Sequence, residues 1–150
     1  MKRTPIRINS FFIEMIIVIV FFTISVSVTL HLFVAANSRA QQSRDLNVAV
    51  IKAENIAEQV KALASPEALP PSLEAAAKSS LSGGVRYRIG YDKQWNVTKD
   101  DPYYTADVIL EKTKSKSGTM VTADIAINRI KTGAKKDIYQ LSTAKYLPVS

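Results

Sequence analysis

The chain contains no cysteine in its 150 residues, and it has one histidine and one tryptophan. Without cysteine it has no disulfide framework, no thiolate metal site and no thiol nucleophile. The histidine, His31, lies in an apolar segment. No Ser/His/Asp set, glycine-rich phosphate loop or metal-spaced histidine cluster accompanies it. The sequence therefore predicts a protein that is not an enzyme and that uses no cofactor.

Residues 11–36 form one long apolar run with a single carboxylate, Glu14. As a helix this run would measure about 39 Å at about 1.5 Å per residue. That length exceeds the hydrocarbon core of a bilayer, which is roughly 30 Å thick. We therefore predict a single-pass transmembrane helix. A carboxylate in such a helix costs free energy, so we expect a partner group to accept its charge.

A short basic leader, residues 1–10, precedes the apolar run. The positive-inside rule then places the N-terminus in the cytoplasm and the remaining chain outside the cell membrane. The alternative is a secretory signal cleaved after Ala36, which would release residues 37–150. The length of the apolar run counts against this alternative, because signal peptides have an apolar region of about 7–15 residues. The basic residues of the leader are Lys2, Arg3 and Arg7.

The helix is predicted to continue through residues 37–64, which contain no glycine or proline and are rich in helix-forming residues. Ser65-Pro66 then ends it, because the residue before proline disfavours the α conformation. Residues 11–64 would form one helix of about 80 Å. Its second half has one apolar stripe that we expect to pack on a sheet of the same chain. The stripe consists of Leu46, Val50, Ala53, Ile56, Ala57, Val60, Leu63 and Ala64.

The remaining sequence predicts a connector and a β domain. The connector, residues 65–84, contains a short helix over 73–81 that Ser72 caps and Gly83-Gly84 ends. Residues 85–150 then alternate between apolar and polar positions, as half-buried strands do. Short links favour an antiparallel sheet of about four strands. The predicted fold class is α+β, with the second half of the long helix covering one face of this sheet.

Outside the apolar run, residues 37–150 hold 17 Lys/Arg and 12 Asp/Glu, a net charge of +5. The excess lies mainly in residues 112–136. Such a bias favours polyanions such as anionic wall polymers, phospholipid headgroups or nucleic acid, although solvated lysines in turns give the same pattern. The candidate polyanion contacts are Lys112, Lys114, Lys116, Lys131, Lys135 and Lys136.

Two further patterns have an ordinary structural explanation that we favour. Oxygen-bearing side chains in one loop resemble Ca²⁺ ligands, but a polar hairpin loop accounts for them. Aromatic residues among basic ones are typical of nucleic-acid binding, but tyrosines at alternating positions also form cores. The loop residues are Asp92, Asn96, Asp100 and Asp101. The aromatic residues are Tyr87, Tyr91, Trp95, Tyr103 and Tyr104, near Arg86, Arg88 and Lys93.

The N-terminal 64 residues resemble those of type IV pilins and type II secretion pseudopilins. The resemblance lies in the basic leader, in the segment Phe11-Phe12-Ile13-Glu14-Met15, and in an apolar run that merges into an amphipathic helix. It implies that a prepilin peptidase removes the leader and that a glutamate at the fifth mature position pairs with the amino group of a neighbouring subunit. It also implies helices bundled in a filament, with the globular domains outward.

The resemblance assigns Glu14 to the fifth mature position, which makes Ser10 the first mature residue and Asn9 the last of the leader. The family has glycine before the cut, and this chain has none in that region. A cut at Asn9-Ser10, a cut at Ser10-Phe11 and an uncut accessory subunit therefore all stay open. In the uncut case Arg7, one heptad before Glu14, is the expected partner of its carboxylate.

The sequence as a whole predicts a structural subunit, minor or accessory, of a type IV pilus or a type II secretion-type pseudopilus. Its expected partners are other pilin-like subunits, a membrane assembly platform and a prepilin peptidase. The alternative function is a membrane-anchored extracytoplasmic module that binds wall polymer or DNA and does not polymerise.

Overall fold

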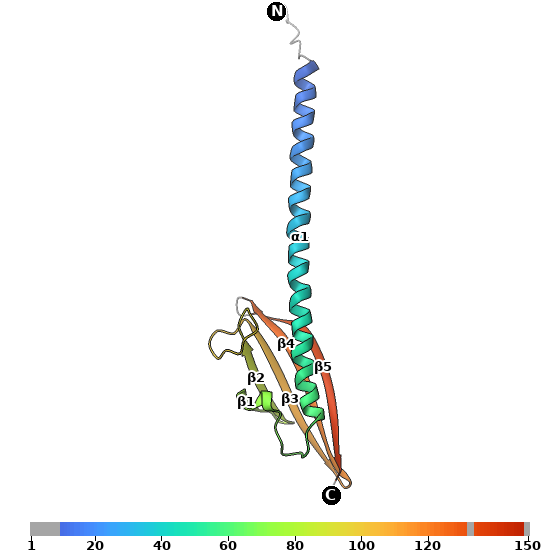
Figure 1. Ribbon diagram of the computed structural model, residues 1–150, viewed down its shortest axis with the longest axis vertical. Helices are drawn as coiled ribbons and strands as arrows, with labels where there is room; N and C mark the ends of the chain where they lie inside the picture. The colour runs from blue at the N-terminus through green and yellow to red at the C-terminus, as the bar shows by residue number, and fades with distance from the viewer. Residues whose placement is uncertain (1–9, 132–133, 149–150) are drawn as a thin grey trace, which may run out of the picture. The chain divides into compact units, whose positions relative to one another are not determined.

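The computed structural model describes residues 10–131 and 134–148. The chain divides into two compact units, Met1–Ser43 and Arg44–Ser150, which we call the N-terminal unit and the sheet unit. One long helix, α1 (Ser10–Lys61), contributes to both units (Figure 1). Its 52 residues contain neither glycine nor proline, which explains why the helix has no break. It ends three residues before the predicted end at residue 64.

In the sheet unit, α1 buries most of the predicted apolar stripe, which is confirmed at its centre. Leu46 and Ala64, at the two ends of the stripe, are exposed, so the prediction is wrong there. Ala64 lies beyond the last helical turn, and the helix contacts the sheet near Leu46 through a polar side chain, Asp45, instead. The buried members of the stripe are Ala53, Ile56, Ala57, Val60 and Leu63, and Ala49 joins them.

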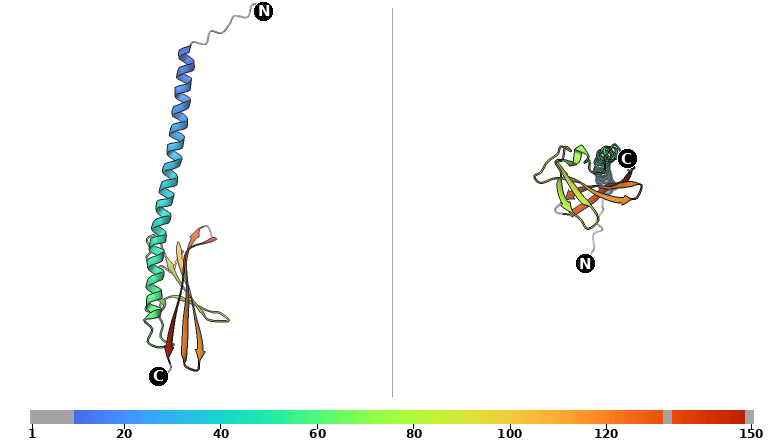
Figure 2. Two further views of the ribbon diagram at one scale, coloured as in Figure 1. Left: turned by 90° about the vertical axis from the view of Figure 1, so that its right-hand side faces the viewer. Right: turned by 90° about the horizontal axis from the view of Figure 1, so that it is seen from below.

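The sheet has five antiparallel strands in the spatial order β1-β2-β3-β4-β5. This order is that of an antiparallel meander, in which consecutive strands pair. The segment of α1 within the sheet unit covers one face of the sheet (Figure 2). The α+β fold class with a long N-terminal helix on an antiparallel sheet is therefore confirmed. The strands are β1 (Ala77–Ser80), β2 (Val85–Tyr91), β3 (Tyr104–Ser115), β4 (Gly118–Lys131) and β5 (Ala134–Pro148).

The extra strand, β1, occupies the segment for which the sequence predicted a short helix. Only a 3-10 turn, η1 (Pro71–Leu73), forms there, and the predicted cap does not exist because the side chain of Ser72 makes no capping bond. Instead, the Ser72 amide donates to Oε1 of Gln59 at 3.0 Å. A helix of about nine residues is marginal on its own. Pairing with the free edge of β2 satisfies the backbone groups of β1 instead.

The inner face of the sheet, which α1 covers, forms the core, and the opposite face is polar. Two residues, 116 and 117, join β3 to β4. A register shift at Ile127/Asn128 changes the pairing of β4 with β5 near the end of β4. The buried strand residues include Tyr87, Ile89, Tyr91, Tyr104, Ala106, Val108, Leu110, Val121, Ala123, Ile125, Ile127 and Leu147.

Candidate functional site

The first candidate site is the apolar part of α1 in the N-terminal unit. Its large hydrophobic side chains, from Phe11 to Val34, are between 46% and 71% exposed. A helix that is apolar on all sides and not buried in its own protein is typical of a membrane span. This helix is the one in the described part of the chain that is long and apolar enough to cross a bilayer. It is compatible with a single-pass membrane anchor.

Three hydroxyl groups within this helix donate hydrogen bonds to carbonyl oxygens one turn earlier in the same helix. The hydroxyl of Thr23 donates to the carbonyl of Ile19 at 2.8 Å, and the hydroxyl of Ser27 donates to the carbonyl of Thr23 at 2.8 Å. The hydroxyl of Thr29 donates to the carbonyl of Ser25 at 2.9 Å. Nδ1 of His31 lies 2.8 Å from the carbonyl oxygen of Ser27. These groups need no partner outside the helix, which distinguishes them from the carboxylate of Glu14.

Glu14 is the fifth residue of α1, which begins at Ser10, and its side chain is exposed. Ser10 and Phe11, two of the predicted processing residues, form the exposed start of the helix. Asn9, the third, lies outside the described residues, as does Arg7. The pairing of Glu14 with Arg7 or with a neighbour therefore remains a prediction.

The candidate polyanion contacts do not form one surface. Lys112 and Lys114 of β3 lie opposite residues 121 and 119, near the start of β4. Lys116 lies in the turn between these two strands. Lys135 and Lys136 pair with the opposite end of β4, about 36 Å away along the strand at about 3.3 Å per residue. Lys131 ends β4 at this second end, and its side chain is outside the described atoms.

Two of these lysines form ion pairs within the sheet unit. Lys112 lies 3.6 Å from the carboxylate of Glu67, which is 82% exposed, so this pair contributes little to stability. Lys135 donates to Asp107 at 2.7 Å. The sequence places these six lysines within 25 residues, but it does not reveal that the long strand β4 separates them into two groups at opposite ends of the sheet.

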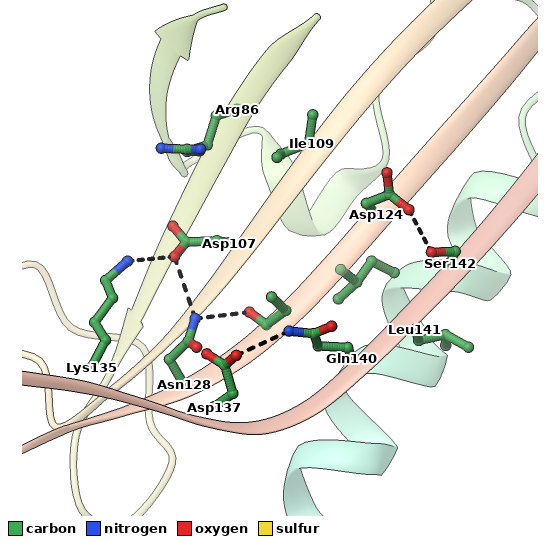
Figure 3. A pocket seen from close by; sticks show the side chains of 12 residues that line it. Arg86, Asp107, Ile109, Asp124, Asn128, Lys135, Asp137, Gln140, Leu141 and Ser142 are labelled. Atoms are coloured by element: carbon green, nitrogen blue, oxygen red, sulfur yellow. Dashed lines mark hydrogen bonds and ion pairs between the residues drawn. The ribbon is translucent and has the colours of Figure 1, made fainter.

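A shallow cavity of about 390 Å³ lies on the polar outer face of the sheet (Figure 3). Asp107 of β3 lines this cavity, and its carboxylate accepts from Arg88 at 2.6 Å, from Lys135 at 2.7 Å and from the side-chain amide of Asn128 at 3.4 Å. Asp124 and Asp137 are also part of the lining, and their carboxylates accept from Ser142 and Gln140. The lining mixes polar and apolar side chains, and its three carboxylates each accept a hydrogen bond from a neighbouring side chain, as in a structural network.

Asp107 gives the sheet unit a pH-dependent contribution to stability. Burial raises the pKa of Asp107, but the hydrogen bonds and charges of Arg88 and Lys135 outweigh burial, so the pKa lies below its ordinary value. A carboxylate with a lowered folded-state pKa stabilises the fold above the unfolded value of about 3.9. This stabilisation is lost as the pH falls through the folded-state pKa.

Asp107→Asn is therefore expected to lower the free energy of unfolding by about 1 kcal/mol at neutral pH. The cost should shrink as the pH falls below about 3.9. Denaturant unfolding of the full chain in detergent, carried out at pH 3 and at pH 7, measures this change in the free energy of unfolding. Asp137→Asn, which removes an exposed carboxylate bonded to Gln140, is the matched control and should change little. An equal cost of Asp107→Asn at pH 3 and pH 7 would contradict this account.

The aromatic residues form part of the core and a cluster at one end of the sheet. Tyr87 and Tyr91 are buried on the inner face, whereas Arg86 and Arg88 alternate onto the outer face. Within β2, the structure thus separates aromatic and basic side chains that lie together in the sequence. Bases that stack on a protein need both kinds of side chain on one surface, and this strand does not provide that.

The cluster is centred on Tyr104 at the start of β3. The ring of Trp95 stacks on it with centroids 3.9 Å apart and an interplanar angle of 11°. Trp95 has a φ of 64°, which is rare for a bulky residue, so the stacking accompanies a strained backbone. The guanidinium of Arg129 lies 5.7 Å from the ring centre of Tyr104. The hydroxyl of Tyr104 donates to Asp45 of α1 at 2.8 Å, and Arg129 forms an ion pair with the same carboxylate.

The loop that contains Asp92, Asn96, Asp100 and Asp101 is a polar turn stabilised by its own hydrogen bonds. Oδ1 of Asp92 accepts from the amides of Gln94 and Asn96 at 2.8 and 2.9 Å, and its other oxygen accepts from the side chain of Asn96. Asp100 and Asp101 are exposed. Within residues 10–131 and 134–148, no group of three or more His, Cys, Asp or Glu side chains is arranged to hold a metal ion.

Sequence reasoning missed Asp45 and Asp107, because polar residues of a helix and of an alternating strand look solvent-exposed without tertiary contacts.

Comparison with protein-family models, with curated proteins and with solved structures finds no match for this chain.

Proposed function

We propose that this protein is a pilin-like structural subunit, minor or accessory, of a type IV pilus or a type II secretion-type pseudopilus. The main support for this proposal is a feature of α1. The apolar half of α1 is exposed on all sides and has a single carboxylate at its fifth position, Glu14. The α+β architecture agrees with it, because the second half of the helix packs on the sheet and leaves the first half free for other helices.

The physics of the bilayer explains why such a helix would assemble. Lipid tails are as apolar as the helix, so close packing and polar contacts drive the association of helices in membranes. Ser25, Ser27 and Thr29 are small enough for close approach. An unpartnered carboxylate costs up to about 2.5–3.5 kcal/mol in the centre of a bilayer and less near an interface. A positive group on a neighbouring subunit would remove much of that cost.

In this proposal the basic leader lies in the cytoplasm and the sheet unit is extracytoplasmic. A prepilin peptidase and a membrane assembly platform are the partners at the membrane, and other pilin-like subunits surround the helix. The alternative, an anchored polyanion-binding module, is weakened because its six candidate lysines lie at two ends of β4.

The mature N-terminus tests the proposal. We expect intact-mass analysis of the protein extracted from its native membrane to give a chain that begins at Ser10 or Phe11. A chain that begins at Met1 would contradict conventional subunit processing. A chain that begins at Asn37 would contradict the anchor itself.

A further inference from the structure

The end of the sheet that contains Tyr104 and Arg129 is tied to α1 close to the apolar run. Both residues bind the carboxylate of Asp45. Asp45 follows Ala36, the last residue of the run, by nine helical residues. At about 1.5 Å per residue, this limits the distance from the run to Asp45 to about 14 Å, whichever way the sheet is turned. We call this part of the sheet unit the tethered end.

The tethered end includes the end of β4, the start of β5 and the β2–β3 loop, which lie at the same end of the sheet (Figure 1). The amide of Ile130 donates to the carbonyl of Tyr103 at 2.8 Å and links the end of β4 to this loop. Residues 129–137 hold four cationic side chains and one carboxylate. These residues therefore have a strong positive excess, whereas the loop has two lysines against three aspartates.

Ion pairs within the sheet unit leave much of this positive charge uncompensated. Arg88 and Lys135 share the one carboxylate of Asp107, so the group keeps a net positive charge. Asp45 neutralises Arg129, and the exposed Lys136 pairs across the strands from Arg129. Lys136 is therefore one of the exposed cations that add positive charge to this end.

Aromatic and apolar side chains accompany these charges. Nζ of Lys93 lies 5.4 Å from the ring centre of Tyr103, and Trp95 stacks on Tyr104 nearby. Val97, on the same loop, is 67% exposed. Tryptophan, tyrosine and basic residues together are typical of protein surfaces at the headgroup level of a membrane.

We propose that the tethered end binds anionic phospholipid headgroups of the membrane in which α1 is anchored. Electrostatic attraction of lysines to an anionic surface acts within a Debye length of about 8 Å. The tether is short enough to let this end approach such a surface to within that distance. The lysines at the other end of β4, about 36 Å away, have no such tether. The proposal depends on the anchor but not on assembly into a pilus.

Trp95, the only tryptophan of the chain, reports on this contact. The full chain is reconstituted in vesicles of phosphatidylcholine, with or without phosphatidylglycerol, that contain a lipid spin-labelled on its headgroup. We expect the label to quench Trp95 fluorescence more strongly in the anionic vesicles, and high salt to remove the difference. Equal quenching in neutral and anionic vesicles would overturn the proposal.

A matched pair of variants tests which end makes the contact. Lys136→Ala is expected to lower the ratio of docked to undocked sheet unit about fivefold, as the loss of one cation near an anionic surface predicts. Lys114→Ala removes the same charge from the far end and should leave quenching unchanged. Both lysines are exposed, so neither change disturbs the core. Equal weakening by the two variants would also overturn the proposal.

Discussion

Glu14→Ala is expected to abolish the association of the N-terminal helix with its neighbours while leaving the helix inserted in the membrane. The substitution removes the carboxylate that a neighbouring positive group would pair with. Truncating one partner of a buried, hydrogen-bonded charge pair costs about 2–5 kcal/mol of association. A loss of 2 kcal/mol corresponds to about 30-fold in the association constant. Insertion, in contrast, should stay equal or improve, because the variant helix has no charged group in lipid.

The absence of cysteine provides the assay. Ser25→Cys introduces a single thiol into the middle of the apolar run, and a photoactivated cross-linker attached to it captures a neighbouring polypeptide. We expect the cross-linked fraction to fall at least tenfold when Glu14→Ala is added. Ile13→Ala, which removes apolar surface next to the carboxylate but no charge, is the control and should keep most of the cross-linking. Unchanged cross-linking in the Glu14→Ala chain would contradict the assigned role.

Asp45→Ala is expected to be the most destabilising polar substitution in the sheet unit. The carboxylate is only 15% exposed and serves both Arg129 and the hydroxyl of Tyr104. Its removal leaves the guanidinium of Arg129, which is 24% exposed, without its counter-charge. Breaking a buried ion pair by deleting one partner costs about 3 kcal/mol or more, and we expect about 3 kcal/mol here because the pair is partly exposed.

Denaturant unfolding of the full chain in detergent, followed by the fluorescence of Trp95, measures this cost. Trp95 stacks on Tyr104 and therefore senses the cluster around Asp45 directly. Glu67→Ala breaks the exposed pair with Lys112 and is the matched control, with an expected cost below about 1 kcal/mol. If the two variants unfold at the same denaturant concentration, Asp45 does not hold the helix on the sheet as proposed.

The elements with strong periodicity could be predicted from the sequence. The apolar stripe of α1 and the alternating strands each contain enough repeats to show their period, and the structure confirms the strands and the centre of the stripe. Val85, Tyr87, Ile89 and Tyr91 alternate with polar residues, as a half-buried strand requires. The α+β fold class could also be predicted, because the apolar stripe of the helix and the apolar face of the sheet must each be buried and can cover each other.

The parts that depend on pairing could not be predicted. β1 has the sequence Ala-Lys-Ser-Ser and no period, and it is a strand only because the edge of β2 offers backbone partners. Asp45 and Arg129 lie 84 positions apart, and no local pattern brings them together. The separation of the candidate lysines into two groups could not be predicted either. It results from the length of β4, and local turn signals do not reveal how far a strand continues.

The central claim is that the protein assembles with other subunits through α1. The most direct test is to identify the molecule that the cross-linker on Ser25→Cys captures in the native membrane. The account predicts an adduct that contains either a second copy of this chain or another protein with an apolar N-terminal helix, cross-linked within that helix. Cross-linking to lipid alone, with no polypeptide adduct at this position or at neighbouring positions around the helix, would contradict assembly through α1.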